Sequence, residues 1–184
     1  MADPAAIRAT KKDPDMKKIL ARVLLAASVS FGASASGASE SDFLTSLKGN
    51  WSGTGMVKVR ANSSPIKVSC KFASDATPSS LALNGNCRGM VVVSRAISAN
   101  LKASGARYSG SYTGAGTGKA GLNGRRRGNA INLAIRWAKE VNGDRDARLV
   151  VEKVGANGMK LITVDRNPAT GKDIVTSQIN LRRL

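Results

Sequence analysis

Apolar and polar residues alternate along most of the chain, and no other feature restricts the fold as strongly. Two of the clearest runs have an apolar residue at every second position: Ile66, Val68, Cys70 and Phe72 in one, and Ile131, Leu133, Ile135 and Trp137 in the other. Successive side chains of a strand point to opposite faces of a sheet, so each run predicts a strand with one buried face. The chain contains about nine or ten such runs, too closely spaced for helical crossovers between parallel strands. Residues 40–48 predict a short helical turn before the first strand.

Asn-Gly pairs mark where the strands turn, because they supply the positive φ angles of a tight hairpin turn. They occur at 84–85, 123–124, 142–143 and 157–158. The pairs at 142–143 and 157–158 lie between alternating runs, which predicts hairpin turns. The pair at 84–85 falls inside an alternating run, so a β-bulge is the alternative there.

Nine or ten antiparallel strands in one open sheet would expose two long edges. Proteins avoid such edges by closing the sheet or by doubling it. We therefore expect an all-β fold, an antiparallel up-and-down barrel of about 8–10 strands that follows the short helical turn. A two-sheet β-sandwich is the alternative.

The N-terminal residues are typical of a targeting segment. A basic stretch starting at Met16 precedes an apolar run from 23 to 33 and the small-residue motif Ala33-Ser34-Ala35. These are the three parts of a cleaved secretory signal peptide, and the apolar run is too short to span a membrane. We therefore expect an upstream extension at 1–15, a signal peptide at 16–38 and one barrel domain at 39–184. The predicted location is periplasmic or secreted.

The predicted export bears on how the net charge and the two cysteines are interpreted. The chain has 29 basic and 12 acidic residues, and residues 39–184 keep 23 and nine of them, a formal charge of +14. An exported basic domain is expected to meet envelope polyanions rather than nucleic acid. Cys70 and Cys87 fall on the apolar parity of neighbouring predicted strands, which predicts a cross-strand disulfide on the inner face.

The absence of histidine from the sequence removes several kinds of chemistry. It excludes a Ser-His-Asp triad, a Cys-His pair and a His-ligated metal. Two cysteines are too few for a four-cysteine zinc site. Asp144 and Asp146 could pair as carboxylates, but their neighbours Arg145 and Arg148 favour surface ion pairs. The Gly-rich stretch 114–119 lacks the spacing and following helix of a P-loop. We expect no cofactor, no metal site and no enzymatic activity.

The segment Leu47-Lys48-Gly49-Asn50-Trp51 resembles the start of lipocalin-type barrels. That resemblance implies a helical turn leading into Gly-x-Trp, with Trp51 closing one end and Arg182 or Arg183 packed over it. Trp51-x-Gly53-x-Gly55, the two cysteines and the closing Leu181-Arg182 are also similar to small exported barrel proteins of alphaproteobacteria. The order of these residues along the chain, a tryptophan, two cysteines and a closing Leu-Arg, is similar to that in periplasmic inhibitors of secreted metalloproteases. This resemblance implies that the segment from Ser39 to Ser46 would enter a protease cleft.

Two groups of residues are candidate ligand-binding sites. Arg125, Arg126 and Arg127 form a positive cluster, predicted at a hairpin tip, that suits phosphate or carboxylate groups. Tyr108, Tyr112 and Trp137 are expected on the inner face, where they would line a pocket if the barrel is open at one end. Trp51, from the resemblance, completes the set.

The function that these features favour is binding rather than catalysis. We expect an exported protein that binds an anionic envelope component, such as lipopolysaccharide, an acidic glycan or a lipid, or a small amphipathic ligand. A periplasmic inhibitor of a secreted protease, with a protein partner, is the first alternative. A structural protein of the cell envelope is the second.

Overall fold

The computed structural model describes residues 39–89, 93–114 and 116–184, except for the side chain of Val93. The predicted upstream extension at 1–15 and signal peptide at 16–38 lie outside the described residues, as does Ala115 of the Gly-rich stretch. None of the helices in the described ranges has the length and apolar character needed to cross a membrane.

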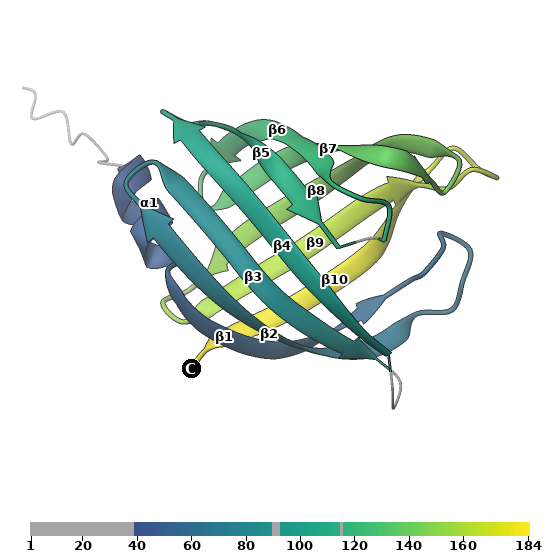
Figure 1. The fold of residues 1–184 in the computed structure, drawn as a ribbon, viewed down its shortest axis with the longest axis horizontal. Coiled ribbons are helices and arrows are strands. Elements are labelled where there is room, and N and C mark those ends of the chain that lie inside the picture. Colours follow the sequence, from purple (N-terminus) through teal and green to yellow (C-terminus); the bar gives the residue numbers. More distant parts are fainter. Residues whose placement is uncertain (1–38, 90–92, 115) are drawn as a thin grey trace, which may run out of the picture. The chain divides into compact units, whose positions relative to one another are not determined.

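The described residues form one helix and ten strands (Figure 1), and the helix α1 spans Glu40–Ser46. The strands are β1 Gly49–Val57, β2 Ile66–Thr77, β3 Ser80–Gly89, β4 Val93–Ser104, β5 Arg107–Thr113, β6 Ala120–Arg127, β7 Ala130–Val141, β8 Asp144–Val154, β9 Gly158–Arg166 and β10 Asp173–Arg183. Each strand pairs antiparallel with the next, and β1 pairs with β10 from Trp51↔Arg183 to Val57↔Ser177. The sheet is therefore a closed up-and-down barrel, as predicted, and the sandwich alternative is wrong.

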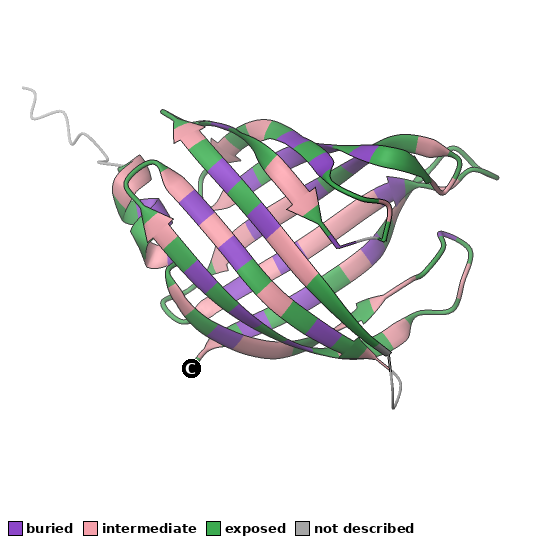
Figure 2. Cartoon of the chain, viewed as in Figure 1, coloured by how far each residue is buried: buried purple, intermediate pink, exposed green. Residues whose placement is uncertain are grey.

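Side chains alternate between the inside and the outside of the barrel along most of the strands, which Figure 2 shows as stripes of buried and exposed residues. In β7, Ile131, Leu133, Ile135 and Trp137 are at most 3% exposed, while the residues between them face outward. The alternation read from the sequence therefore places the apolar faces correctly. Closure leaves no edge strand in the described barrel.

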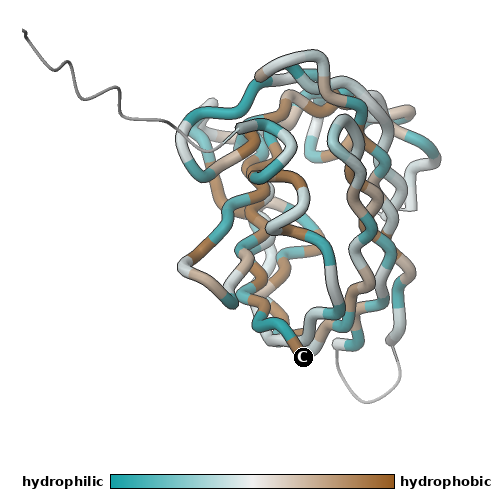
Figure 3. The backbone as a smooth tube through the Cα atoms, turned by 90° about the vertical axis from the view of Figure 1, so that its left-hand side faces the viewer, coloured by the Kyte–Doolittle hydropathy of each residue, from teal (hydrophilic) through white to brown (hydrophobic). Residues whose placement is uncertain are grey.

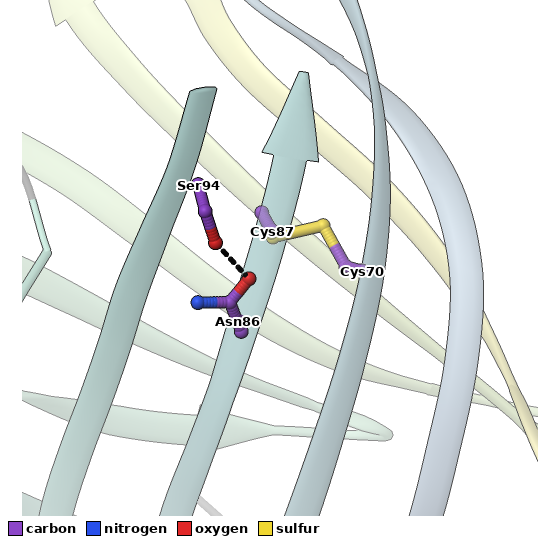
Figure 4. Close-up of a disulfide and its surroundings, with 4 residues drawn as sticks. All are labelled: Cys70, Asn86, Cys87 and Ser94. Carbon is purple, nitrogen blue, oxygen red and sulfur yellow. Dashed lines mark hydrogen bonds between the residues drawn. A yellow bond between two sulfur atoms is a disulfide. The ribbon is translucent and has the colours of Figure 1, made fainter. Parts of the chain in front are cut away.

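The disulfide joins Cys70 of β2 to Cys87 of β3, two directly opposed residues whose Cα atoms are 4.1 Å apart (Figure 4). Both cysteines are buried on the inner face, as predicted. On the outer face of the barrel, the hydroxyl of Ser94 in β4 donates a hydrogen bond of 2.6 Å to the side chain of Asn86 in β3, which links these two strands.

Two of the Asn-Gly pairs mark hairpins and two do not. Asn142 and Gly143 both have positive φ and form the β7–β8 turn. The β8–β9 hairpin turns at 155–157, so Gly158 already belongs to β9. The pair at 84–85 lies in β3 with continuous register to both neighbours, so no bulge occurs there. The pair at 123–124 lies inside β6, where a side chain at position 124 would collide with the Asn132 carbonyl of β7.

Candidate functional site

Helix α1 closes one end of the barrel, the end that faces the viewer in Figure 3. Ser39 caps the helix by accepting a hydrogen bond from the Asp42 N–H at 3.1 Å. Phe43, Leu44 and Leu47 are at most 5% exposed and join the apolar core. The segment from Ser39 to Ser46, expected to enter a protease cleft under the inhibitor interpretation, is thus packed against its own barrel.

Trp51 lies at this closed end, where the lipocalin resemblance places it. It is fully buried, and its indole N–H donates to the Leu47 carbonyl at 3.1 Å. The guanidinium of Arg183 lies over the ring, 4.4 Å from its centroid. It also donates to the Ser46 carbonyl at 2.7 Å and to the Lys48 carbonyl. Of the two predicted arginines, Arg183 covers the tryptophan and Arg182 faces outward.

Gly49 of the Gly-x-Trp motif has a structural role in this arrangement. Its φ is +140°, a conformation that L side chains rarely adopt. A Cβ atom there would lie 2.4 Å from the Arg183 guanidinium. The glycine therefore leaves the space that Arg183 needs to reach the helix.

The arginine cluster at 125–127 divides between the two faces of β6. Arg126 points inward, forms a 2.9 Å ion pair with Glu40 and lies 4.8 Å from the centroid of the Phe43 ring. Arg125 and Arg127 face outward and are exposed. The three arginines end β6 directly before the β6–β7 turn, so they lie beside the hairpin tip, but only two of them contribute to an exposed positive cluster.

Tyr108 belongs to the closed end rather than to a pocket. It is 3% exposed, and its hydroxyl hydrogen-bonds to Glu40, the same carboxylate that pairs with Arg126. Burial, together with the negative charge of Glu40, raises the pKa of Tyr108 well above its usual range. The tyrosine therefore stays a neutral donor that holds the first turn of α1.

The middle of the described barrel is filled. A small apolar void of ≈ 30 Å³ lies there, lined by side chains that include Leu83, Leu149 and Leu161. At the opposite end from α1, a cavity of ≈ 420 Å³ opens between the strands. Cavities of roughly 300–1,000 Å³ are typical of small-molecule sites. The barrel is therefore closed at one end and hollow at the other.

Apolar side chains form most of the wall of this cavity: Val57, Ile66, Val68, Ile97, Trp137 and Ile179. Tyr112 and Trp137, two of the predicted site residues, meet there edge to face with their ring centroids 5.8 Å apart. Burial raises the pKa of Tyr112 to about 12, with the nearby Arg95 opposing the shift and Asp165 adding to it. The structure thus separates Tyr112 and Trp137 from Trp51 and Tyr108, which lie at the other end.

Asp165 is the charged residue deepest in the cavity wall, and it is only 5% exposed. Its Oδ2 accepts a hydrogen bond from the Thr176 hydroxyl. Burial raises its pKa, and the negative charge of Asp144 adds to the rise. The donors Thr176, Trp137 and Asn142 around the carboxyl oppose the rise. The Trp137 indole N–H nevertheless makes no hydrogen bond of normal geometry to the carboxyl.

Asp165 was not among the predicted site residues, although its position in the alternating run carried a signal. Asp165 has the same parity as Met159, Leu161 and Thr163, so a carboxylate on the inner face of β9 could have been inferred. Thr176 gave no such signal. It points inward because the β9–β10 register shifts between Val175 and Ser177, and such a bulge redirects one side chain.

Comparison with known proteins gives no family to which the chain can be assigned. No family model matches it, and no curated protein matches it in sequence. The lipocalin resemblance is consistent with the ten-stranded barrel, its helical start and the Trp51–Arg183 contact. What the site can do therefore has to be argued from its own geometry.

Proposed function

We propose that this protein binds a small, largely apolar molecule in the cavity at the open end of the barrel and does not transform it. The observation that carries the proposal is a cavity of ≈ 420 Å³ with mainly apolar walls and a few polar groups. Concave, mainly apolar sites with few placed polar groups are what small ligands occupy. Because α1 closes the opposite end of the barrel, the ligand would enter the cavity from the open end only.

A neutral fluorescent dye, phenylnaphthylamine, tests this proposal. Its emission is expected to rise when it enters the cavity of the protein. Val68→Phe would fill part of the cavity, whereas Val154→Phe adds the same volume on the exposed surface near the closed end. Binding should fall at least tenfold in Val68→Phe and stay unchanged in Val154→Phe, with both variants folded by circular dichroism. Equal binding by the two variants would contradict the proposal.

A second candidate partner is an anionic surface or polymer of the cell envelope. Arg107 and Arg125 face each other directly across β5 and β6, and both are exposed. Like charges in directly opposed positions destabilise a sheet, and neither arginine has an ion-pair partner among the described residues. With Arg127 beside them, they favour an anionic partner at the outer face.

Vesicles containing anionic lipid test this second candidate. Replacing both Arg107 and Arg125 with Ala should weaken binding and reduce its dependence on salt. Arg136→Ala is the matched control, because Arg136 is exposed but already pairs with Asp146 at 2.6 Å. If the control weakens binding as much as the double variant, the attraction depends on net charge and not on this pair.

Export is part of the proposal, supported by the sequence of residues 16–38. Mass spectrometry of the protein recovered from the cells that make it should show an N-terminus after Ala35 or Ala38. A protein that retains Met16 would contradict export. The protease-inhibitor alternative receives less support, because Phe43 and Leu44 of the segment it requires are buried in the barrel end.

A further inference from the structure

Arg95 of β4 is an arginine on the inner face of the barrel at its open end. It lies directly opposite Cys87 of β3, which is buried on the inner face, and directly opposed residues of a sheet share a face. Arg95 itself is exposed and lines the open-end cavity, so a ligand can reach its guanidinium. It forms no ion pair with any described residue. An inward-facing cation of this kind is a candidate contact for an anionic group of the ligand.

Two glycines of the Gly-rich stretch 114–119 leave room for polar side chains at this end of the cavity. A Cβ atom at Gly116, whose φ is +78°, would lie 2.8 Å from the Arg95 guanidinium. A Cβ atom at Gly114 would lie 2.5 Å from the Tyr112 hydroxyl. Because the two glycines are two residues apart and both side chains line the cavity, the guanidinium and the hydroxyl lie at the same part of its wall.

The guanidinium and the hydroxyl together match the hydrogen-bonding needs of a carboxylate. A guanidinium is planar, always charged and presents paired N–H donors that fit the two oxygens of a carboxylate. Burial raises the pKa of Tyr112 to about 12, so its hydroxyl stays protonated at neutral pH and can donate a hydrogen bond. One carboxylate can therefore accept hydrogen bonds from both side chains.

The other charged groups of the cavity wall also favour an anion. Lys58 lines the cavity as well, and its ammonium donates a long hydrogen bond of 3.5 Å to the Ala61 carbonyl. Asp165 is the one acidic residue among the described residues of the wall. It is only 5% exposed, and its carboxyl already accepts a hydrogen bond from Thr176. A ligand that enters the cavity thus meets two cations and a carboxyl that is turned away from it.

We propose that the cavity selects apolar ligands that end in a carboxylate, and that Arg95 and Tyr112 bind this carboxylate. The proposal rests on the function proposed above and specifies the chemical class of the ligand. The apolar chain of such a ligand lies against Val68, Ile97 and Ile179, which line the same cavity.

Three compounds with the same alkyl chain test the selection: decanoate, decanol and decylamine. Each competes with phenylnaphthylamine for the wild-type protein at pH 8, where decanoate is ionised. In a cavity without a cation near the head group, decanol would bind best, because burying an unpaired carboxylate costs more than burying a hydroxyl. With Arg95 and Tyr112 as donors, decanoate should displace the dye about tenfold better than decanol. Decylamine should displace it least well.

Variants at the two donors and one matched control locate the effect. Arg95→Met should reduce the preference for decanoate over decanol to about threefold or less and leave displacement by decanol unchanged. Arg95→Gln is a second variant that removes the charge and keeps a polar side chain. Tyr112→Phe keeps the ring against Trp137 and should also lower the preference. Arg88→Met is the control, because Arg88 is exposed, follows Cys87 in β3 and has the opposite facing, toward the outside.

The outcomes separate this proposal from the cavity function. Displacement by decanol or decylamine that equals or exceeds displacement by decanoate would overturn the carboxylate proposal. A decanoate preference that survives in both Arg95 variants would also overturn it, as would an equal loss of preference in Arg88→Met. Binding of the dye and decanol without a preference for decanoate refutes only this proposal. Failure of the dye and all three compounds to bind refutes the cavity function as well.

Discussion

Replacing Arg183 with Met is expected to loosen the closed end of the barrel, because the guanidinium makes three contacts there. It donates to the Ser46 and Lys48 carbonyls and covers the Trp51 ring at 4.4 Å. Hydrogen bonds that involve a charged group contribute about 1.5 kcal/mol each at the low end, and a partly exposed cation–π contact about 0.5 kcal/mol. Met keeps much of the aliphatic packing, so the loss should come from these contacts and amount to about 3.5 kcal/mol.

Urea unfolding followed by tryptophan fluorescence measures this loss. With a slope of about 1.5 kcal/mol/M, a loss of about 3.5 kcal/mol lowers the midpoint by about 2.3 M urea. Arg182→Met is the matched control, because Arg182 is the neighbouring residue and faces solvent. Its effect should stay within about 0.5 kcal/mol. Equal midpoints for the two variants would refute the role assigned to Arg183.

Three further predictions concern the disulfide, the cavity acid and the helix. Replacing Cys70 and Cys87, which are separated by 17 residues, with Ala should lower the unfolding free energy by at least about 3 kcal/mol in urea titrations, and a smaller loss would contradict the loop-entropy estimate. Because the pKa of Asp165 is raised, the wild type should lose stability relative to Asp165→Asn as pH rises from about 4 through that pKa, and parallel pH–stability curves would contradict this. Glu40→Gln should lower the melting temperature because it removes the partner of Arg126, whereas the exposed Asp42→Asn should not, and equal shifts would contradict the specific contact.

Much of the fold follows from the sequence because the barrel has one dominant regularity. Every inward residue of β7 from Ile131 to Trp137 was placed on the correct face by alternation alone. The same alternation predicted a disulfide between Cys70 and Cys87 on neighbouring strands, which the structure confirms. Asn142-Gly143 predicted a turn correctly, because the turn needs positive φ at both positions and Asn and Gly adopt it readily.

The rest depends on contacts between residues far apart in the chain. Arg126 looked like part of an exposed cluster, and only the position of α1 shows that Glu40, 86 residues away, meets it inside the barrel. Gly124 resembled a turn residue, yet it lies within β6, where the absence of a side chain lets the backbone of β7 come close. Thr176 points into the cavity because the β9–β10 register shifts beside it, and the local sequence pattern does not predict that shift.

The cavity itself could not be inferred from any stretch of sequence. It exists because ten strands enclose more space than their inner side chains fill, and α1 fills that space at one end only. Tyr112 and Trp137 were correctly expected on the inner face, but the same expectation included Tyr108, which lies at the plugged end. Alternation gives the face of a residue and not its height along the barrel.

A crystal structure of the protein soaked with bromohexanol tests the central claim most directly, because bromine can be located by its anomalous scattering. We expect one strong bromine peak inside the open-end cavity near Val68 and Ile97. An empty cavity at saturating bromohexanol, or bromine peaks confined to the outer surface, would contradict the claim that this cavity is the binding site.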